Sequence, residues 1–196
     1  MFAEKNKFVL LDRDGVINRH IPGGYVTSWT EFEFLPWALQ GLRLLAQNSY
    51  GVLVISNQAC VGKGLLSGPD LDSITKRFVS EVRSAGGDIR GVFYCTHLAE
   101  ERCDCRKPQP GLLLRAQSEY GFHFADTFVV GDSASDLDAA RRVGAPALLV
   151  SAEADGKVSG GSPRAVRSLY EAVEFILATE PENMCTFSKR ALRAKR

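Results

Sequence analysis

The feature that most constrains the fold is a regular alternation between short apolar runs and longer segments with helical periodicity. Each apolar run is rich in Val, Leu, Ile and Phe, which is typical of strands buried on both faces of a sheet. Strands that alternate with helices of about ten or more residues are parallel and joined by crossovers, so an α/β fold is expected. We expect this fold to be a doubly wound parallel sheet in a three-layer α/β/α sandwich. The predicted strands are 7–11, 52–55, 91–94, 127–130 and 147–150, and the predicted helices are 36–47, 69–85, 110–120, 135–143 and 164–178.

Length and composition predict one domain with a full core. The chain has 196 residues, of which 45% are hydrophobic, and this is enough to fold without disulfides. Its 24 basic and 23 acidic residues give a formal charge of +1, which favours neither nucleic acid nor an anionic membrane as a partner. We expect a single domain over 1–180, and a monomer because no amphipathic, aromatic-rich face stands out.

The termini and apolar runs predict a cytoplasmic protein. No run approaches the roughly 18 to 20 residues that span a bilayer, and the N-terminal segment lacks the apolar region of a signal peptide. A mobile surface loop is expected at 151–163. The basic tail at 181–196 is expected to be a disordered end, and a nucleic-acid-binding arm is the less favoured interpretation.

Polar clusters follow four of the predicted strands directly. They are Asp12-Arg13-Asp14-Gly15, Ser56-Asn57-Gln58, Cys95-Thr96-His97 and Gly131-Asp132. The carboxyl ends of parallel strands meet at one edge of the sheet, which is where ligands bind in such folds. A Gly- and Pro-bearing segment at about 19–30 follows the first cluster and is too irregular for a helix, so we expect it to form a small loop that caps the site.

Three carboxylates in these clusters predict a magnesium site. Asp12, Asp14 and Asp132 would place like charges together at one strand edge, which is costly without a compensating cation. Hard oxygen donors suit Mg²⁺. Asp12 and Asp14 could instead only cap a turn, but their position after a buried strand favours the metal. Lys107 could add a fixed cation for phosphate oxygens or be an ordinary solvated lysine, and Ser56 and Asn57 offer a phosphate seat.

Taken together, these motifs resemble the haloacid dehalogenase superfamily of phosphatases. The four motifs occur in order and span roughly residues 7 to 150. They are Asp12-Arg13-Asp14-Gly15-Val16, Ser56-Asn57-Gln58, Lys107-Pro108, and Gly131-Asp132 with Asp136 behind. Ser56 stands where threonine is common, and this difference preserves the hydroxyl.

The resemblance implies hydrolysis of a phosphate monoester through a covalent intermediate. Asp12 would be the nucleophile and Asp14 the general acid and then the general base. Mg²⁺ would be held by Asp12, the carbonyl of Asp14 and Asp132, with Lys107 and Ser56 completing the contacts to the phosphoryl group. Asp136 would support this arrangement from behind.

A second pattern, Cys95-x-His97-x5-Cys103-x-Cys105, predicts structural zinc in the loop 95–105. Three thiolates and one imidazole make a closed tetrahedral set that leaves no position for water. Free thiols could also be grouped by chance, but such spacing is rare without a metal. The zinc would fold the loop that leads into Arg106 and Lys107. Cys60 and Cys185 are interpreted as ordinary thiols.

The zinc loop narrows the resemblance to a branch that contains heptose bisphosphate phosphatases and histidinol-phosphate phosphatases. Gly24-Tyr25-Val26 followed by Phe32-Glu33-Phe34 is similar to the former, although the cap loop is about two residues longer, whereas the five-residue gap before Cys103 is more similar to the latter. We give the cap loop more weight because it would lie over the leaving group. The expected reaction removes the C7 phosphate of a heptose 1,7-bisphosphate, and the product would feed nucleotide-activated heptose.

Contacts to this small phosphorylated substrate follow from the resemblance by position. They are assigned to Arg19, Tyr25, Asn57, Gln58 and Arg106. The heptose enzymes usually carry a lysine where this chain has Ser133, so a phosphate contact there is not expected. Two different functions stay open beside the phosphatases. One is a catalytically silent, zinc-stabilised phosphate-binding module, which the presence of Asp12 and Asp14 disfavours, and the second is phosphoryl transfer to an acceptor other than water.

Overall fold

One parallel sheet organises the chain in the computed structural model, which describes residues 7–153 and 164–179. Its strand order is β3-β2-β1-β4-β5-β6, and every neighbouring pair is parallel. The strands are β1 (Lys7–Leu11), β2 (Tyr50–Asn57), β3 (Ile89–Cys95), β4 (Val129–Gly131), β5 (Ala147–Val150) and β6 (Arg164–Val166).

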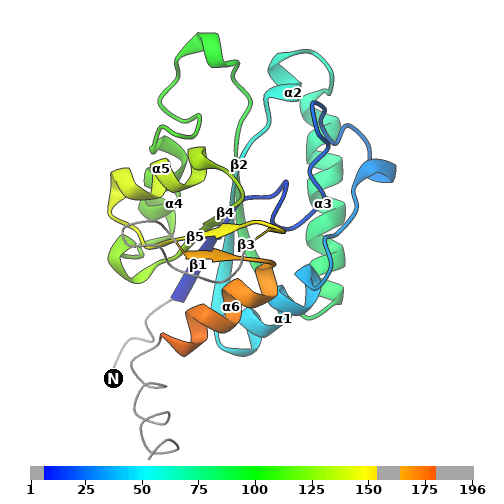
Figure 1. Ribbon diagram of the computed structural model, residues 1–196. Helices are drawn as coiled ribbons and strands as arrows, with labels where there is room; N and C mark the ends of the chain where they lie inside the picture. Colours follow the sequence, from blue (N-terminus) through cyan, green and yellow to red (C-terminus); the bar gives the residue numbers. More distant parts are fainter. Residues whose placement is uncertain (1–6, 154–163, 180–196) are drawn as a thin grey trace, which may run out of the picture.

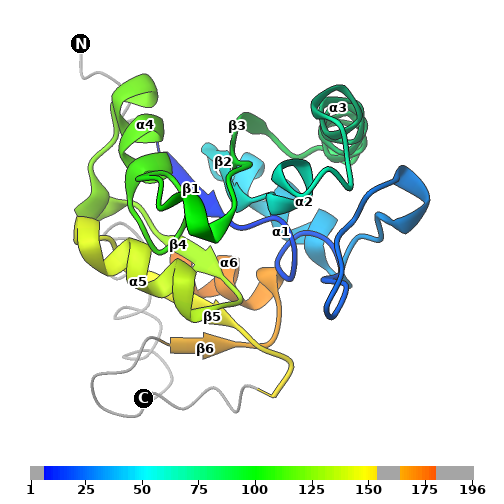
Figure 2. The ribbon, with the colours of Figure 1, turned by 90° about the horizontal axis from the view of Figure 1, so that it is seen from above.

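Helices cover both faces of this sheet and make three layers, as the sequence predicts (Figures 1 and 2). One face carries α1 (Ala38–Gln47), α3 (Gly68–Ser84) and α6 (Leu169–Ala178), and the other carries α4 (Gly111–Tyr120) and α5 (Ala134–Val143). A short helix, α2 (Ala59–Gly62), follows β2 directly. Three single 3₁₀ turns complete the helical segments of the described residues: Trp29–Glu31, Ala99–Glu101 and Phe124–Asp126.

The apolar strands bury both of their faces, and so they divide the core in two. Along β1, Val9 and Leu11 belong to the cluster under α1, α3 and α6, whereas Phe8 and Leu10 belong to the cluster under α4 and α5. Successive side chains of a strand point to opposite faces, so a continuous apolar run serves both cores. The central strands are therefore rigid supports for whatever follows their carboxyl ends.

The segment 164–178 was predicted as one helix, and this prediction is wrong at its start. Residues Arg164–Val166 form β6, which pairs with β5, and the helix begins only after Ser168, whose hydroxyl accepts a hydrogen bond from the backbone N–H of Glu171. A three-residue strand is too short to show the alternation of apolar and polar residues that identifies a strand, and here an apolar helix follows it closely. The sheet consequently has one more strand than the sequence predicted.

Other boundaries differ by a few residues. Strand β2 extends two residues beyond each end of the predicted 52–55, and the short helix α2 was not predicted. Most of the predicted loop at 151–163 and all of the basic tail at 181–196 lie outside the described residues, so these remain predictions. In the described part of the chain, no helix is long and apolar enough to cross a membrane.

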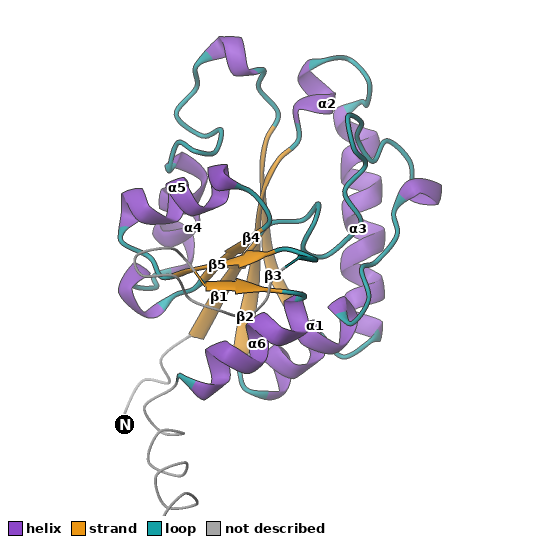
Figure 3. Cartoon of the chain, viewed as in Figure 1, coloured by secondary structure: helices purple, strands orange, loops and turns teal. Residues whose placement is uncertain are grey.

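The sheet changes winding direction between β1 and β4. The chain moves from β1 outward through β2 to β3, then returns to the other side of β1 and continues outward through β4, β5 and β6. Crossovers on the two sides diverge at such a point and leave a crevice beyond the strand ends. Figure 3 shows long loops at this edge, above the carboxyl ends of the central strands.

Candidate active site

Asp12 and Asp132 meet at this switch point because the strands that carry them are neighbours. The backbone N–H of Asp12 donates to the carbonyl of Val130, a 2.9 Å bond that continues the pairing of β1 with β4 past the end of β1. One carboxylate oxygen each from Asp12, Asp132 and Asp136 lie within 4.8 Å of one another. Oxygens bound to one Mg²⁺ are separated by at most about 4.2 Å, given Mg–O bonds of about 2.1 Å, so the bound of 4.8 Å on this cluster is close to the spacing that such an ion needs.

Two glycines allow the carboxylates to approach the backbone so closely. A Cβ at Gly15, which has a φ of +86°, would lie 1.9 Å from an oxygen of Asp132. A Cβ at Gly131 would lie 2.2 Å from the Cβ of Asp136. Any side chain at either position would therefore displace a carboxylate, and Gly15 also needs the left-handed conformation that other residues rarely adopt.

Lys107 is buried among the carboxylates, so the interpretation of this residue as a solvated lysine is wrong. Its ammonium lies 3.0 Å from Oδ1 of Asp12 and 2.5 Å from Oδ1 of Asp136, and it donates to the carbonyl of Ile55 at 2.6 Å. The second carboxylate oxygen of Asp136 accepts from the backbone N–H and hydroxyl of Ser133, which starts α5. Asp136 thus connects the Lys107 ammonium to the first residues of α5.

Burial and charge shift the pKa values in this cluster. Burial raises the pKa of Asp12, with Lys107 opposing the shift and Asp136 adding to it. Burial alone would lower the pKa of Lys107, but the charges of Asp12 and Asp136 outweigh it and raise that pKa. Burial, Asp12 and Asp136 raise the pKa of Asp132 to about 6. A divalent cation would relieve this repulsion, which supports a metal at the cluster.

Asp14 is held differently from Asp12, by uncharged amides and an arginine. Its two oxygens accept hydrogen bonds from the guanidinium of Arg13 (3.0 Å), the amide of Asn18 (2.8 Å) and the amide of Gln58 (2.7 Å). Its side chain remains 21% exposed and lines the cavity. Asp14 therefore has a fixed orientation with one side open to a ligand.

The predicted cap loop lies over these groups and closes a cavity of about 290 Å³. Backbone hydrogen bonds fasten its base, from Arg19 to Glu33 and from Leu35 to Ile17, at 2.8 and 3.0 Å. The cavity is lined by the cap residues His20, Ile21, Gly24, Tyr25 and Val26, and by Asp12, Asp14, Ser56, Asn57, Lys107, Asp132, Ser133 and Ser135. A space of this size suits a small ligand.

Two of the residues predicted to contact substrate line the cavity. Tyr25 lies in the cap, and the ammonium of Lys63 is 5.1 Å from the centre of its ring. Asn57 also lines the cavity, but its amide exchanges two 3.0 Å hydrogen bonds with the backbone of Lys107. Asn57 therefore positions the Lys107 segment, in addition to whatever contact it makes with a ligand.

The remaining three predicted contacts lie elsewhere. Gln58 is buried and bonded to Asp14 and Ser56, so it has no surface for a substrate. The Arg19 side chain is 64% exposed and paired with Glu33. Arg106 donates to the carbonyl of His97 and lines a second pocket of about 340 Å³, which shares Lys107 with the main cavity. These placements came from motif position alone, which does not determine where a side chain points.

Three polar lining residues were not predicted as ligand contacts: His20, Ser133 and Ser135. The charge of His20 lowers the pKa of Asp132, so the imidazole acts on the carboxylate cluster. His20 lies in the predicted cap loop, and the two serines belong to the predicted motif after β4. Their location was therefore predictable, whereas their orientation was not.

The four predicted zinc ligands converge in the loop after β3. Five of their ligand-to-ligand distances lie between 3.2 and 3.6 Å, including Cys105 Sγ to Cys95 Sγ at 3.3 Å. A tetrahedral zinc with Zn–S bonds of about 2.3 Å would need about 3.7 Å between sulfurs, so the donor set fits that metal closely. Burial and the neighbouring thiols raise the pKa of Cys105 to about 12, so the thiolates need a cation to coexist.

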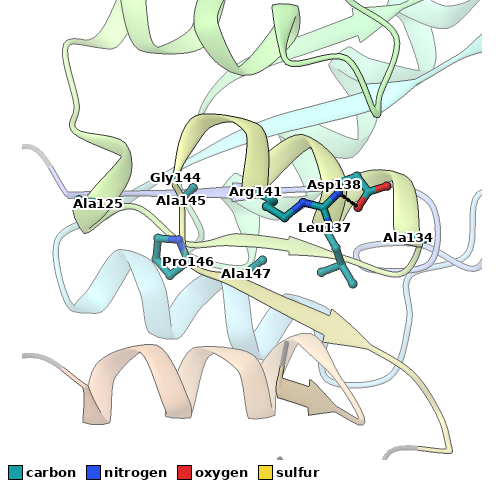
Figure 4. Close-up of a pocket in the computed structure, with 9 residues that line it drawn as sticks. All are labelled: Ala125, Ala134, Leu137, Asp138, Arg141, Gly144, Ala145, Pro146 and Ala147. Atoms are coloured by element: carbon teal, nitrogen blue, oxygen red, sulfur yellow. Dashed lines mark ion pairs between the residues drawn. The ribbon is translucent and has the colours of Figure 1, made fainter. Parts of the chain in front are cut away.

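A larger surface pocket of about 690 Å³ lies outside this site, between α5 and β5. Figure 4 shows its lining, which includes four alanines, Leu137, Pro146 and the ion pair of Arg141 with Asp138. Its single carboxylate is paired with Arg141, and it has no cluster of carboxylates. The chemistry therefore belongs to the smaller cavity at the strand ends.

Comparisons with known proteins identify the family of this chain. A family model described as HAD-hydrolase-like matches residues 104–168. A D-glycero-alpha-D-manno-heptose-1,7-bisphosphate 7-phosphatase of Mycobacterium tuberculosis is 41% identical, covering 78% of this chain and 82% of that protein. A D-glycero-beta-D-manno-heptose-1,7-bisphosphate 7-phosphatase of Helicobacter pylori is 35% identical, covering 67% of this chain and 76% of that protein.

Among solved structures, a D,D-heptose 1,7-bisphosphate phosphatase from B. bronchiseptica, complexed with magnesium and phosphate, superimposes with a TM-score of 0.81. It is 31% identical, and the match covers 89% of this chain and 99% of that chain. The resemblance inferred from the four motifs is thereby confirmed. The chain belongs to the haloacid dehalogenase-like family of phosphatases, together with the heptose-1,7-bisphosphate 7-phosphatases.

Proposed function

We propose that the protein removes the C7 phosphate of D-glycero-D-manno-heptose 1,7-bisphosphate, through an aspartyl-phosphate formed on Asp12. The observation that carries the proposal is the arrangement around Asp12. Its carboxylate lines a small capped cavity, 3.0 Å from the buried Lys107 ammonium and within reach of the Asp132 carboxylate. A nucleophile, a fixed cation and a metal-type ligand thus converge on one point.

In the first step, Asp12 attacks phosphorus with a carboxylate oxygen. Its Oδ1 also accepts a 2.7 Å hydrogen bond from the backbone N–H of Arg13, which fixes the carboxylate plane. As the bond from Asp12 to phosphorus forms, the bond from phosphorus to the sugar oxygen breaks, and that oxygen takes a proton from Asp14. Lys107 and Ser56 line the same cavity and stabilise the charge on the phosphoryl oxygens.

In the second step, water attacks the phosphorus of the aspartyl-phosphate. Asp14, now a carboxylate, accepts the proton of the water, the bond to Asp12 breaks, and inorganic phosphate leaves. Asp14 ends the cycle protonated and Asp12 ends it as a carboxylate. The same residue can serve both steps because it faces the cavity while three donors hold it from behind.

Two metals complete the proposal. Mg²⁺ would be held by Asp12, Asp132 and the carbonyl of Asp14, and would neutralise charge on the phosphoryl group. The related B. bronchiseptica enzyme was crystallised with magnesium and phosphate. Zn²⁺ would be held by Cys95, His97, Cys103 and Cys105 and would have a structural role, because four protein donors leave no open position.

The sugar assignment rests on relatives at 41% and 35% identity, which act on the alpha and beta anomers respectively. The higher identity favours the alpha anomer. Histidinol phosphate remains the competing substrate, because the short zinc loop of this chain resembles that of the histidinol enzymes. Both are small monoesters, so the volume of the cavity does not separate them.

The test is phosphate release by the purified protein with Mg²⁺, comparing both heptose 1,7-bisphosphate anomers with histidinol phosphate. We expect kcat/KM for one heptose anomer to exceed that for histidinol phosphate by about a hundredfold or more, equivalent to about 2.7 kcal/mol of transition-state discrimination. Asp12→Asn is the control for contaminating phosphatases. A preference for histidinol phosphate would reject the sugar assignment, and a kcat/KM in Asp12→Asn equal to that of the parent would reject the mechanism.

A further inference from the structure

Arg13 lies between the two proposed catalytic aspartates and is fully buried, which is rare for an arginine. Its guanidinium lies over two rings, 6.0 Å from the centre of Phe32 and 5.7 Å from the centre of Tyr94. Its Nε and Nη1 atoms have no hydrogen-bond partner among the described residues. Burying a charge in this way is costly, so an arginine that served only to fill space would be a poor choice.

The third guanidinium nitrogen of Arg13 is directed at the catalytic acid. Nη2 lies 3.0 Å from both oxygens of Asp14 and 3.0 Å from Oε1 of Gln58. An arginine can only donate, so the carbonyl end of the Gln58 amide must face it. The amino end of Gln58 is thereby directed the opposite way, where it donates to Asp14 at 2.7 Å and to the hydroxyl of Ser56 at 3.1 Å.

This arrangement links the two catalytic carboxylates through one amide. The Ser56 hydroxyl lowers the pKa of Asp12, and the Gln58 amide donates to both Ser56 and Asp14. Arg13 determines which way that amide is turned. Phe32 follows the cap loop and stacks on Phe78 of α3, so the guanidinium also joins the cap to the catalytic edge. Neither the arginine nor the glutamine is among the residues that line the cavity.

We propose that Arg13 and Gln58 are a pair of positioning residues that hold the Asp14 carboxyl in register with Asp12 for proton transfer. This inference rests on the proposed function, because it assumes that Asp14 acts as acid and base. It reassigns Gln58 from substrate contact to orientation of the acid. The pair acts through Asp14 and touches neither the phosphoryl group nor the sugar.

Substrates with different leaving groups distinguish a positioning role from general structural damage. The p-nitrophenolate leaving group needs no proton, so attack of Asp12 on p-nitrophenyl phosphate does not depend on Asp14, whereas hydrolysis of the aspartyl-phosphate does. In Arg13→Met we therefore expect a stoichiometric burst of nitrophenolate at a rate within about threefold of the parent. Steady-state turnover should then be lower by roughly a hundredfold, the usual contribution of a positioned acid or base.

With heptose 1,7-bisphosphate, whose sugar oxygen needs the proton, no burst is expected, and phosphate release should also fall by roughly a hundredfold. Gln58→Leu keeps the arginine and should show the same pattern, which tests the pair if Arg13→Met fails to fold. Arg141→Met is the matched control, because it removes an Arg–Asp ion pair of the same 3.0 Å length from the surface of α5. It should leave both rates unchanged.

A burst rate that falls as far as the turnover would mean that the whole site is displaced and would overturn the proposal. Unchanged turnover in both variants would also overturn it. Failure of the proposed function has a different outcome, because Asp12→Asn would then release nitrophenolate at the parent rate. Circular dichroism and metal content of each variant establish that the compared proteins are folded alike.

Discussion

Two clusters of metal-type ligands lie at the same edge of the sheet, and they are built on opposite principles. The cluster of Cys95, His97, Cys103 and Cys105 consists of three thiols and one imidazole, all carried on one segment of eleven residues that starts at the end of β3. The cluster around Asp12 and Asp132 consists of hard oxygens from different strands, with the ammonium of Lys107 among them. The ligands of the first cluster are close together in the sequence, whereas those of the second are brought together only by the tertiary structure.

The difference explains which cluster can do chemistry. Four protein donors would satisfy a zinc ion completely, so an ion held by the loop cluster would only stabilise the backbone around it. The carboxylate cluster faces a cavity and supplies few donors, so a cation bound there would keep positions open for a phosphoryl group. Lys107 connects the two, because it follows the zinc loop in sequence and ends among the carboxylates.

Replacing Lys107 should have the largest effect on both stability and activity. Lys107→Met leaves Asp12 and Asp136 buried without their shared cation, so we expect unfolding free energy to fall by about 3–5 kcal/mol and kcat by at least roughly a thousandfold. Urea denaturation and phosphate release measure the two effects. In Arg141→Met, which removes an exposed ion pair, stability should change by less than about 0.5 kcal/mol. Equal stability of the two variants would show that the buried cluster does not depend on the lysine.

Breaking the zinc loop should have a smaller effect on stability. Cys105→Ser removes one of the four donors, so we expect the zinc to be lost and the Tm to fall by roughly 5–10 °C, or about 2–3 kcal/mol, because the sheet itself keeps its core. Metal analysis after dialysis and thermal unfolding are the measurements. Cys60→Ala is the control for metal content, since Cys60 is not among the four clustered donors. Full zinc retention in Cys105→Ser would contradict the assigned ligand set.

The smallest expected effect is the contribution of the Asp132 carboxylate to stability in protein from which metal has been removed. The pKa of Asp132 is raised from 3.8 to about 6 in the folded state. Between these pH values the folded protein keeps a proton that the unfolded chain has released, so stability falls as pH rises through this window. The full shift corresponds to about 3 kcal/mol, which partial exposure reduces to about 1–2 kcal/mol.

Asp132→Asn removes this dependence on pH. In the presence of chelator its Tm should exceed that of the parent by about 2–6 °C near pH 7.5, and the two should agree near pH 4. With excess Mg²⁺ at neutral pH, the Tm of the parent should instead exceed that of Asp132→Asn, because only the parent keeps the carboxylate ligand. A constant difference at all pH values would indicate a packing effect and would reject the electrostatic explanation.

The sequence was a good guide to features that depend on local pattern. The β1 range, the α/β class, the edge of the sheet that carries the polar clusters and the four clustered zinc donors were all predicted from spacing and periodicity. It failed where a feature depends on a distant partner. Strand β6 exists because β5 offers an open edge, and the buried state of Lys107 depends on two carboxylates from different segments.

The sequence by itself determined the chemistry available to the protein: Asp12 and Asp14 after a buried strand, a lysine after a zinc-type loop, and Asp132 after a later strand. These were readable because strand and turn preferences act over a few residues. Only the tertiary structure decided which side chains face the cavity. It turned Tyr25 inward, left Arg19 outside and buried Gln58 against Asp14. The physical reason is that orientation is set by hydrogen bonds and charges between segments far apart in the chain, such as the contact of Arg13 with Gln58, and no local pattern records them.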